Sequence, residues 1–91
     1  MKISARVVVT GRVQGVAYRQ STQMQARQLN VNGWVRNLPD SSVEGWFEGD
    51  EPNVQALIDW CHTGPRMAMV EKVQVERGEF TGQHTDFAIR F

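Results

Sequence analysis

The chain turns from a strand into a helix at Thr10–Arg19, which has the sequence Thr-Gly-Arg-Val-Gln-Gly-Val-Ala-Tyr-Arg. Gly11 and Gly15 let backbone N–H groups approach a ligand closely, because glycine has no Cβ. Free amides at a helix N-terminus, together with the helix dipole, form a site for an anion. Arg19 adds a planar guanidinium that can hold a phosphate through two hydrogen bonds. The loop alone is equally compatible with a simple connector that carries a surface arginine.

Strand and helix patterns extend on both sides of this loop. Alternating apolar residues at 3–9 predict a strand before it, and apolar residues at helical spacing over 18–29 predict a helix after it. Gly33 is the expected stop of that helix. Residues 34–37 and 43–48 predict two strands of a hairpin, joined by the turn sequence Leu-Pro-Asp-Ser-Ser.

The second half of the chain repeats the order of helix and strand. Asp50-Glu51-Pro52 predicts a helix start, and an apolar stripe at helical spacing continues to Cys61. Val70, Val73 and Val75 predict a fourth strand with a bulge, because positions 70 and 73 are out of phase. Residues 87–91 alternate again and predict a last strand.

This order of elements favours an α+β fold. Strand, helix, strand, strand, helix, strand, with a terminal strand or extension added, matches the ferredoxin-like βαββαβ plan, in which an antiparallel sheet carries two helices on one face. No internal repeat or linker divides the chain, so we expect one domain over residues 1–91.

The composition is that of an ordinary globular protein, with 41% apolar and 22% charged residues. Ten basic and ten acidic side chains give a formal net charge of zero, which argues against broad binding to nucleic acid or to an anionic membrane. The N-terminal residues lack the apolar core of a signal peptide, and no run reaches the roughly 18 apolar residues that span a bilayer. We therefore expect a cytoplasmic protein.

The sequence evidence for other functional sites is weaker than the evidence for the loop. Cys61 completes the apolar stripe of the second helix, so core packing explains it better than a nucleophilic thiolate does. His62 and His84 have no partner at metal-ligand spacing, and we expect no metal site. Asn37 ends the second strand, where its amide can hold a water molecule in line with a bound phosphorus. It is also compatible with a turn-capping role before Leu-Pro-Asp.

Two stretches together resemble the acylphosphatase family. Gly11–Arg19 resembles the first signature of that family, and Gly33–Asn37, followed by Val43 and Gly49, resembles the second. The similarity covers nearly the whole chain in length and element order, and it includes the Gly64-Pro65 pair before the fourth strand.

The resemblance implies a metal-independent hydrolase without a cofactor, acting on small-molecule acyl phosphates. It implies that Arg19 binds the phosphate and that Asn37 positions the attacking water. By the same resemblance, the backbone amides expected to complete the phosphate site are those of Gln14, Gly15, Val16, Ala17, Tyr18 and Arg19. We expect the protein to act as a monomer.

One position departs from the family pattern. Ser41 stands in the hairpin turn where the family usually has glycine. If that position requires a positive φ, serine costs on the order of 1 kcal/mol of stability.

Two alternatives to the enzyme stay open on the residues alone. The first is a sensor that binds an anion without chemistry. The second is a ferredoxin-like module that binds single-stranded RNA on its open sheet face, although the paired aromatic residues and basic surround of such a module are not evident.

Overall fold

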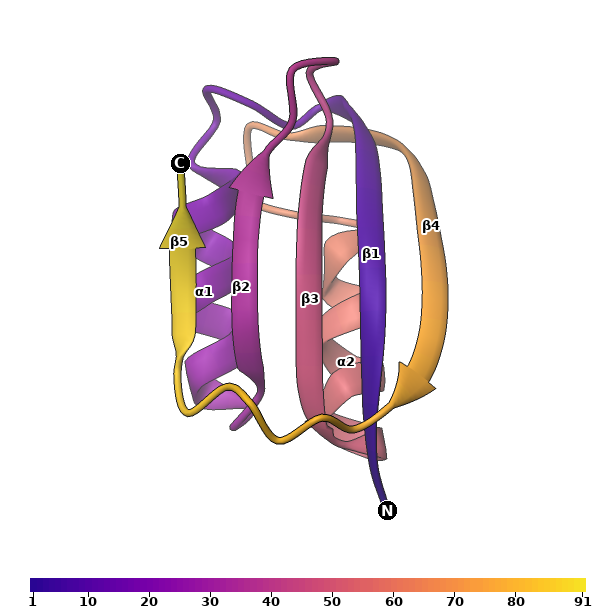
Figure 1. Ribbon diagram of the computed structural model, residues 1–91. Helices are drawn as coiled ribbons and strands as arrows, with labels where there is room; N and C mark the ends of the chain where they lie inside the picture. The colour runs from indigo at the N-terminus through magenta and orange to yellow at the C-terminus, as the bar shows by residue number, and fades with distance from the viewer.

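Five strands form a single sheet, and both helices lie on one of its faces (Figure 1). The computed structural model describes residues 1–91. The elements follow the chain in the order β1 (Lys2–Arg12), α1 (Tyr18–Gln28), β2 (Asn32–Asn37), β3 (Val43–Asp50), α2 (Glu51–Cys61), β4 (Met69–Glu79) and β5 (Phe87–Arg90). Neither helix is long and apolar enough to cross a membrane.

The sheet has the strand order β4-β1-β3-β2-β5. Its first four strands are antiparallel, which confirms the ferredoxin-like α+β fold. The last strand adds parallel to β2 and makes the complete sheet mixed. β5 is parallel to β2 because the connection after β4 runs along the lower end of the sheet in Figure 1, so that β5 starts at the same end as β2. Because β3 separates β1 from β2, no strand ladder joins the loop after β1 to the end of β2.

The hydrophobic core lies between the sheet and the two helices. Strand positions that face the helices alternate with positions on the open face, as the period of a strand requires. The apolar stripe predicted for the second helix supplies Val54, Leu57, Ile58 and Cys61. From the strands, the core takes Ile3, Ala5, Val7, Val9, Val35, Val43, Phe47 and Phe87.

The predicted bulge in the fourth strand is present. Thr10 pairs with Lys72, but Gly11 pairs with Val70, so Glu71 is an extra residue on β4. The insertion turns Val70 to the same side as Val73, and both pack partly buried against the core.

The first helix ends earlier than predicted. Asn30 has a φ of 56°, and the Asn30 and Val31 N–H groups donate to the carbonyls of Arg27 and Ala26, which is the Schellman arrangement. Gly33, the expected stop, lies inside β2 instead. A Cβ on Gly33 would fall 1.7 Å from the Trp46 carbonyl oxygen, so glycine is required there by the close approach of β3.

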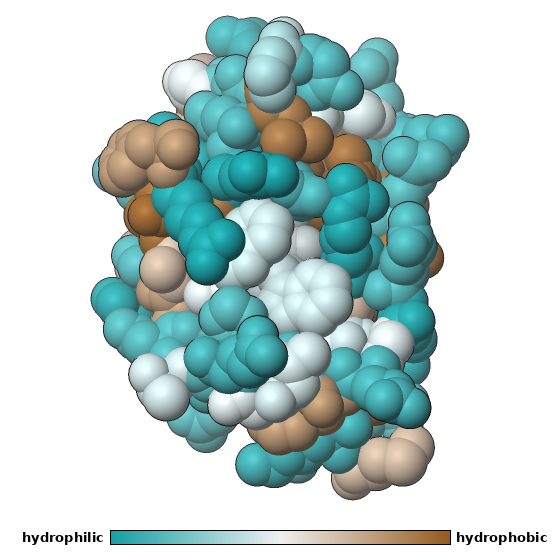
Figure 2. Space-filling view, viewed as in Figure 1, coloured by the Kyte–Doolittle hydropathy of each residue, from teal (hydrophilic) through white to brown (hydrophobic).

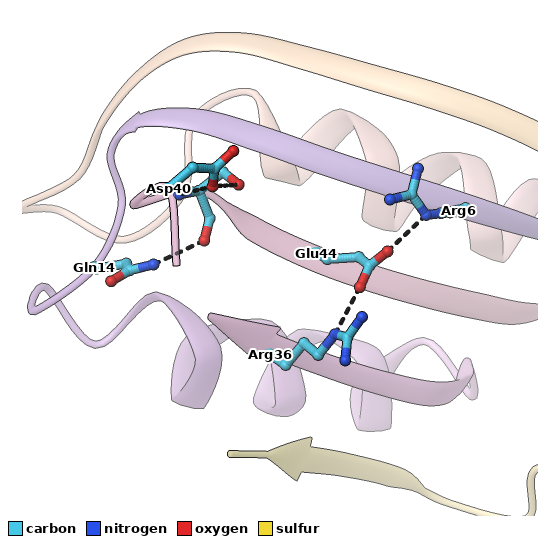
Figure 3. A network of polar contacts seen from close by, with 6 residues as sticks. Arg6, Gln14, Arg36, Asp40 and Glu44 are labelled. Atoms are coloured by element: carbon cyan, nitrogen blue, oxygen red, sulfur yellow. Dashed lines mark hydrogen bonds and ion pairs between the residues drawn. The ribbon is translucent and has the colours of Figure 1, made fainter. Parts of the chain in front are cut away.

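The sheet face without helices is largely hydrophilic (Figure 2). On it, Glu44 of β3 accepts hydrogen bonds of 2.6 Å from both Arg6 of β1 and Arg36 of β2 (Figure 3). Burial alone would raise the pKa of the Glu44 carboxyl, but the bonds from Arg36 and Arg6 outweigh it and hold that pKa below its ordinary value. The carboxylate thus joins three neighbouring strands.

Candidate active site

A cavity of about 220 Å³ opens where the loop after β1 meets the ends of β2 and β5. The predicted pair, Arg19 and Asn37, both line it. The other lining residues are Val13, Gln14, Gly15, Ala17, Tyr18, Gln20, Ile89 and Phe91. Of the six residues predicted for the phosphate site, Gln14 to Arg19, Val16 alone does not line the cavity, because its side chain packs in the core. The fold therefore gathers residues from three separate parts of the chain around one space.

The loop presents backbone amides rather than side chains. Gly15 has a φ of 75° and Ala17 a φ of 62°, so two residues in the left-handed region bend the chain sharply just before α1. No side chain caps the helix at Ala17. The backbone–backbone hydrogen bonds outside the helices and strands include none donated by residues 14–17. These N–H groups are therefore available to a ligand at the positive end of the helix dipole.

Arg19 is held from one side by the end of the sheet. Its Nη1 donates to the Arg90 carbonyl oxygen at 3.3 Å, and its guanidinium lies 5.0 Å from the centre of the Phe91 ring. No carboxylate of the chain forms an ion pair with it. The positive charge at the cavity is thus not neutralised from within the protein, which favours an anionic ligand.

Asn37 is the last residue of β2. Its Oδ1 atom is buried and accepts no hydrogen bond from the protein. A buried polar atom without a partner costs free energy, and such atoms are uncommon in folded proteins. Because Asn37 lines the cavity, a water molecule or a ligand in that space can supply the missing donor.

Tyr18 fixes the position of the loop against the second helix. Its hydroxyl donates to the Cys61 carbonyl oxygen at 2.7 Å, and the ring leaves no room for a side chain at Gly64, where a Cβ would lie 2.6 Å from the Tyr18 Cε2 atom. Burial raises the pKa of the Tyr18 hydroxyl, so it stays protonated and keeps this bond. The sequence analysis placed Tyr18 in the first helix and its backbone amide in the phosphate site, but it did not predict this side-chain hydrogen bond.

Gln14 contributes a contact that the sequence did not predict. Its Nε2 donates to the Leu38 carbonyl oxygen at 2.9 Å and to the Ser42 carbonyl oxygen at 2.8 Å. Figure 3 shows its side chain reaching from the loop toward the β2–β3 turn. Glutamine is common in loops and helices, so this contact between the loop and the turn could be identified only from the folded structure.

The other candidates lie apart from the cavity. Cys61 is buried in the core, and burial raises the pKa of its thiol to about 12, which removes any nucleophilic thiolate at neutral pH. His62 contacts the Ile58 carbonyl within its own helix turn. No three His, Cys, Asp or Glu side chains gather in an arrangement that fits a metal ion. Independence from metals stays a prediction.

Comparison with known proteins assigns the chain to a family. The family model described as "Acylphosphatase" matches residues 5–89. A protein of Geotalea uraniireducens named "Acylphosphatase" is 58% identical over 91 residues, and the match covers 100% of both chains.

Two solved structures of acylphosphatases have nearly the same fold. The structure from Bacillus subtilis has a TM-score of 0.94 at 32% identity and covers 98% of this chain and 99% of its own. The structure from Coxiella burnetii has a TM-score of 0.93 at 34% identity and covers 98% of this chain and 93% of its own. On its sequence and its fold, the chain belongs to the acylphosphatase family of hydrolases.

Proposed function

We propose that this protein hydrolyses the carboxyl–phosphate bond of acyl phosphates to a carboxylate and inorganic phosphate. The observation that supports this most concerns Asn37: its buried Oδ1 atom has no partner, and the residue lines the same cavity as Arg19 and the loop residues Gln14, Gly15 and Ala17. In this proposal, an anion site and a site for one polar donor share the cavity.

The loop and Arg19 hold the phosphoryl group in this proposal. Arg19 is suited to grip two phosphate oxygens with its planar guanidinium. The loop amides that surround the remaining oxygens are those of Gln14, Gly15, Val16, Ala17, Tyr18 and Arg19. Charge spreads over the phosphoryl oxygens in the transition state, so fixed donors stabilise it without reorganisation.

Asn37 positions the nucleophile. Its Oδ1 accepts a hydrogen bond from a water molecule, which it aims at phosphorus opposite the departing carboxylate. Asn37 is too weak a base to remove the proton, so a phosphoryl oxygen of the substrate accepts it. Catalysis then comes from orientation and charge stabilisation.

The leaving group decides the substrate class. The cavity is lined by no Ser, Cys, His, Asp or Glu side chain that could act as nucleophile or general acid. An alkoxide would need protonation as it leaves, whereas a carboxylate leaves as a stable anion. This lining therefore suits a mixed anhydride of a carboxylic acid and phosphoric acid better than a phosphate monoester.

Turnover of acetyl phosphate by the purified protein tests the proposal. We expect Arg19→Ala to abolish measurable turnover and to weaken inhibition by inorganic phosphate. Asn37→Ala should lower kcat by about 10²–10³-fold with phosphate inhibition retained. Arg27→Ala, on the same helix but paired with Asp86 outside the cavity, is the matched control and should keep kcat within about twofold.

Two results would contradict the proposed roles. Absence of turnover in the unmodified protein, with phosphate still bound, would make it an anion sensor. Loss of phosphate inhibition in Asn37→Ala would show that Asn37 binds phosphate and does not steer water.

The remaining expectations belong to the same proposal. We infer a cytoplasmic monomer that needs no metal and binds no nucleic acid. On the open sheet face, Arg6 and Arg36 are both paired with Glu44, which supports the last point. Titration with a single-stranded oligonucleotide at physiological salt tests it, and saturable binding would contradict it.

A further inference from the structure

We propose that Gln14 is a positioning residue: its side chain fixes the position of Asn37 relative to the bound phosphoryl group. This inference rests on the proposed function and adds to it a part for the Gln14 side chain, separate from the backbone amide of the same residue. Its amide nitrogen donates to both the Leu38 and the Ser42 carbonyl oxygens, at 2.9 and 2.8 Å.

The strand order explains why such a link is needed. The phosphate loop follows β1 and Asn37 ends β2, but β3 lies between these strands. The pairing of β1 with β3 stops at Val9 and Val43, before the loop begins. Outside the helices and strands, no backbone–backbone hydrogen bond joins residues 13–17 to residues 38–42. The two halves of the site therefore meet without support from the sheet.

Gln14 supplies that support at the neck of the hairpin. Leu38 follows Asn37 directly, and the Leu38 N–H donates to the Ser42 carbonyl oxygen at 2.9 Å across the turn. The two acceptors of Gln14 are thus the residues that close the turn. Both hydrogens of one planar amide are used, so the loop and the turn are fixed in orientation as well as in distance.

The consequence is specific to the attack of water. A water molecule held by Asn37 must lie in line with phosphorus, and a misplacement of about 1 Å can cost about 10²-fold in rate. The amides and Arg19 hold phosphate from the loop side and need no contact with the hairpin to do so. Loss of the Gln14 bridge should therefore lower kcat and leave phosphate binding nearly unchanged.

The test is a double-mutant cycle with Gln14→Met and Asn37→Ala, assayed with acetyl phosphate as substrate and inorganic phosphate as inhibitor. Methionine keeps the length and volume of glutamine but donates no hydrogen bond. We expect Gln14→Met to lower kcat by about tenfold or more and to keep the inhibition constant of phosphate within about twofold. In the Asn37→Ala background the same substitution should change kcat by less than about twofold, because there is no positioned water to misplace.

Gln23→Met is the matched control. Gln23 lies on α1, and its Nε2 donates to the Phe87 carbonyl oxygen at 2.8 Å, away from the hairpin. Like Gln14→Met, the Gln23→Met variant loses side-chain hydrogen bonding to a backbone carbonyl, but at a place away from the hairpin. We therefore expect its kcat to stay within about twofold of that of the unmodified protein. Gln14→Asn, which keeps the amide but is one methylene shorter, should also lose rate, and it replaces Gln14→Met should that variant not fold.

The inference is overturned if the effects of Gln14→Met and Asn37→Ala on kcat multiply, or if the phosphate inhibition constant rises as far as kcat falls. If Asn37→Ala is too slow to assay, the comparison of kcat with the inhibition constant decides alone. Failure of the unmodified protein to hydrolyse acetyl phosphate would instead refute the proposed function.

Discussion

Ser41 offers a direct test of the backbone reasoning, because replacement by glycine should stabilise the protein. Its φ is 77°, so the serine lies in the left-handed region that the departure from the family pattern had suggested. The side chain is exposed and forms no hydrogen bond that glycine would lose. The Ser41 N–H donates to the Leu38 carbonyl oxygen at 3.2 Å, and this bond remains in the variant.

The expected gain is the difference of two effects. An L residue in the left-handed region costs about 1–2 kcal/mol, which Ser41→Gly relieves. Glycine makes the unfolded chain more flexible, which takes back about 0.4–1 kcal/mol. The net increase in the free energy of unfolding should be about 0.5–1 kcal/mol. With an m-value of about 1–1.5 kcal/mol per molar urea, the midpoint of unfolding should rise by about 0.3–1 M.

Urea unfolding followed by tryptophan fluorescence measures this shift, and Ser41→Ala is the control. Alanine lacks the hydroxyl but keeps the Cβ that causes the strain, so its midpoint should not rise. An unchanged or lower midpoint for Ser41→Gly, or an equal rise for Ser41→Ala, would refute the reasoning. Turnover should stay within about twofold in both variants, because the turn keeps its backbone hydrogen bonds.

Three further predictions concern other parts of the molecule. Gly33→Ala should prevent folding or cost more than about 3 kcal/mol, since its Cβ would lie 1.7 Å from the Trp46 carbonyl oxygen; a native circular dichroism spectrum with unchanged stability would contradict this. Glu44 has a pKa held below its ordinary value of 4.5, so its contribution to stability is present above pH 4.5 and is lost as the pH falls through the lowered pKa. Urea midpoints across that range should therefore fall less steeply in Glu44→Gln than in the unmodified protein, and equal slopes would count against the ion pairs. Turnover of acetyl phosphate should survive excess EDTA, whereas loss that Mg²⁺ restores would reveal a required metal.

Local patterns determined most of the elements of this fold. Alternation in the strands and the i, i+3, i+4 stripe of the second helix depend only on neighbouring residues, so the sequence expresses them directly. The bulge in the fourth strand was also predictable, because Val70 and Val73 are out of phase unless one residue is inserted. The predicted end of the first helix was wrong. The residue that follows the helix in the left-handed conformation is Asn30 and not Gly33.

The parallel placement of β5 could not be predicted from its own residues. Alternation shows that residues 87–90 form a strand with one buried face, but the same alternation suits either edge of the sheet and either direction. The path of the chain after β4 selected the β2 edge. The apolar lining that β5 gives to the cavity follows from that placement.

The sequence by itself determined the chemical groups of the site: a glycine-containing loop that leads into a helix, an arginine in its first turn, and an asparagine at a strand end. Only the tertiary structure decided that Arg19 and Asn37 line one cavity, that Gln14 joins the loop to the hairpin, and that the Asn37 Oδ1 atom is left without a partner. The physical reason is the distance along the chain over which each effect acts. Backbone preferences act over a few residues, whereas the residues of this site are far apart in the sequence, and only the packing of the helices on the sheet brings them together.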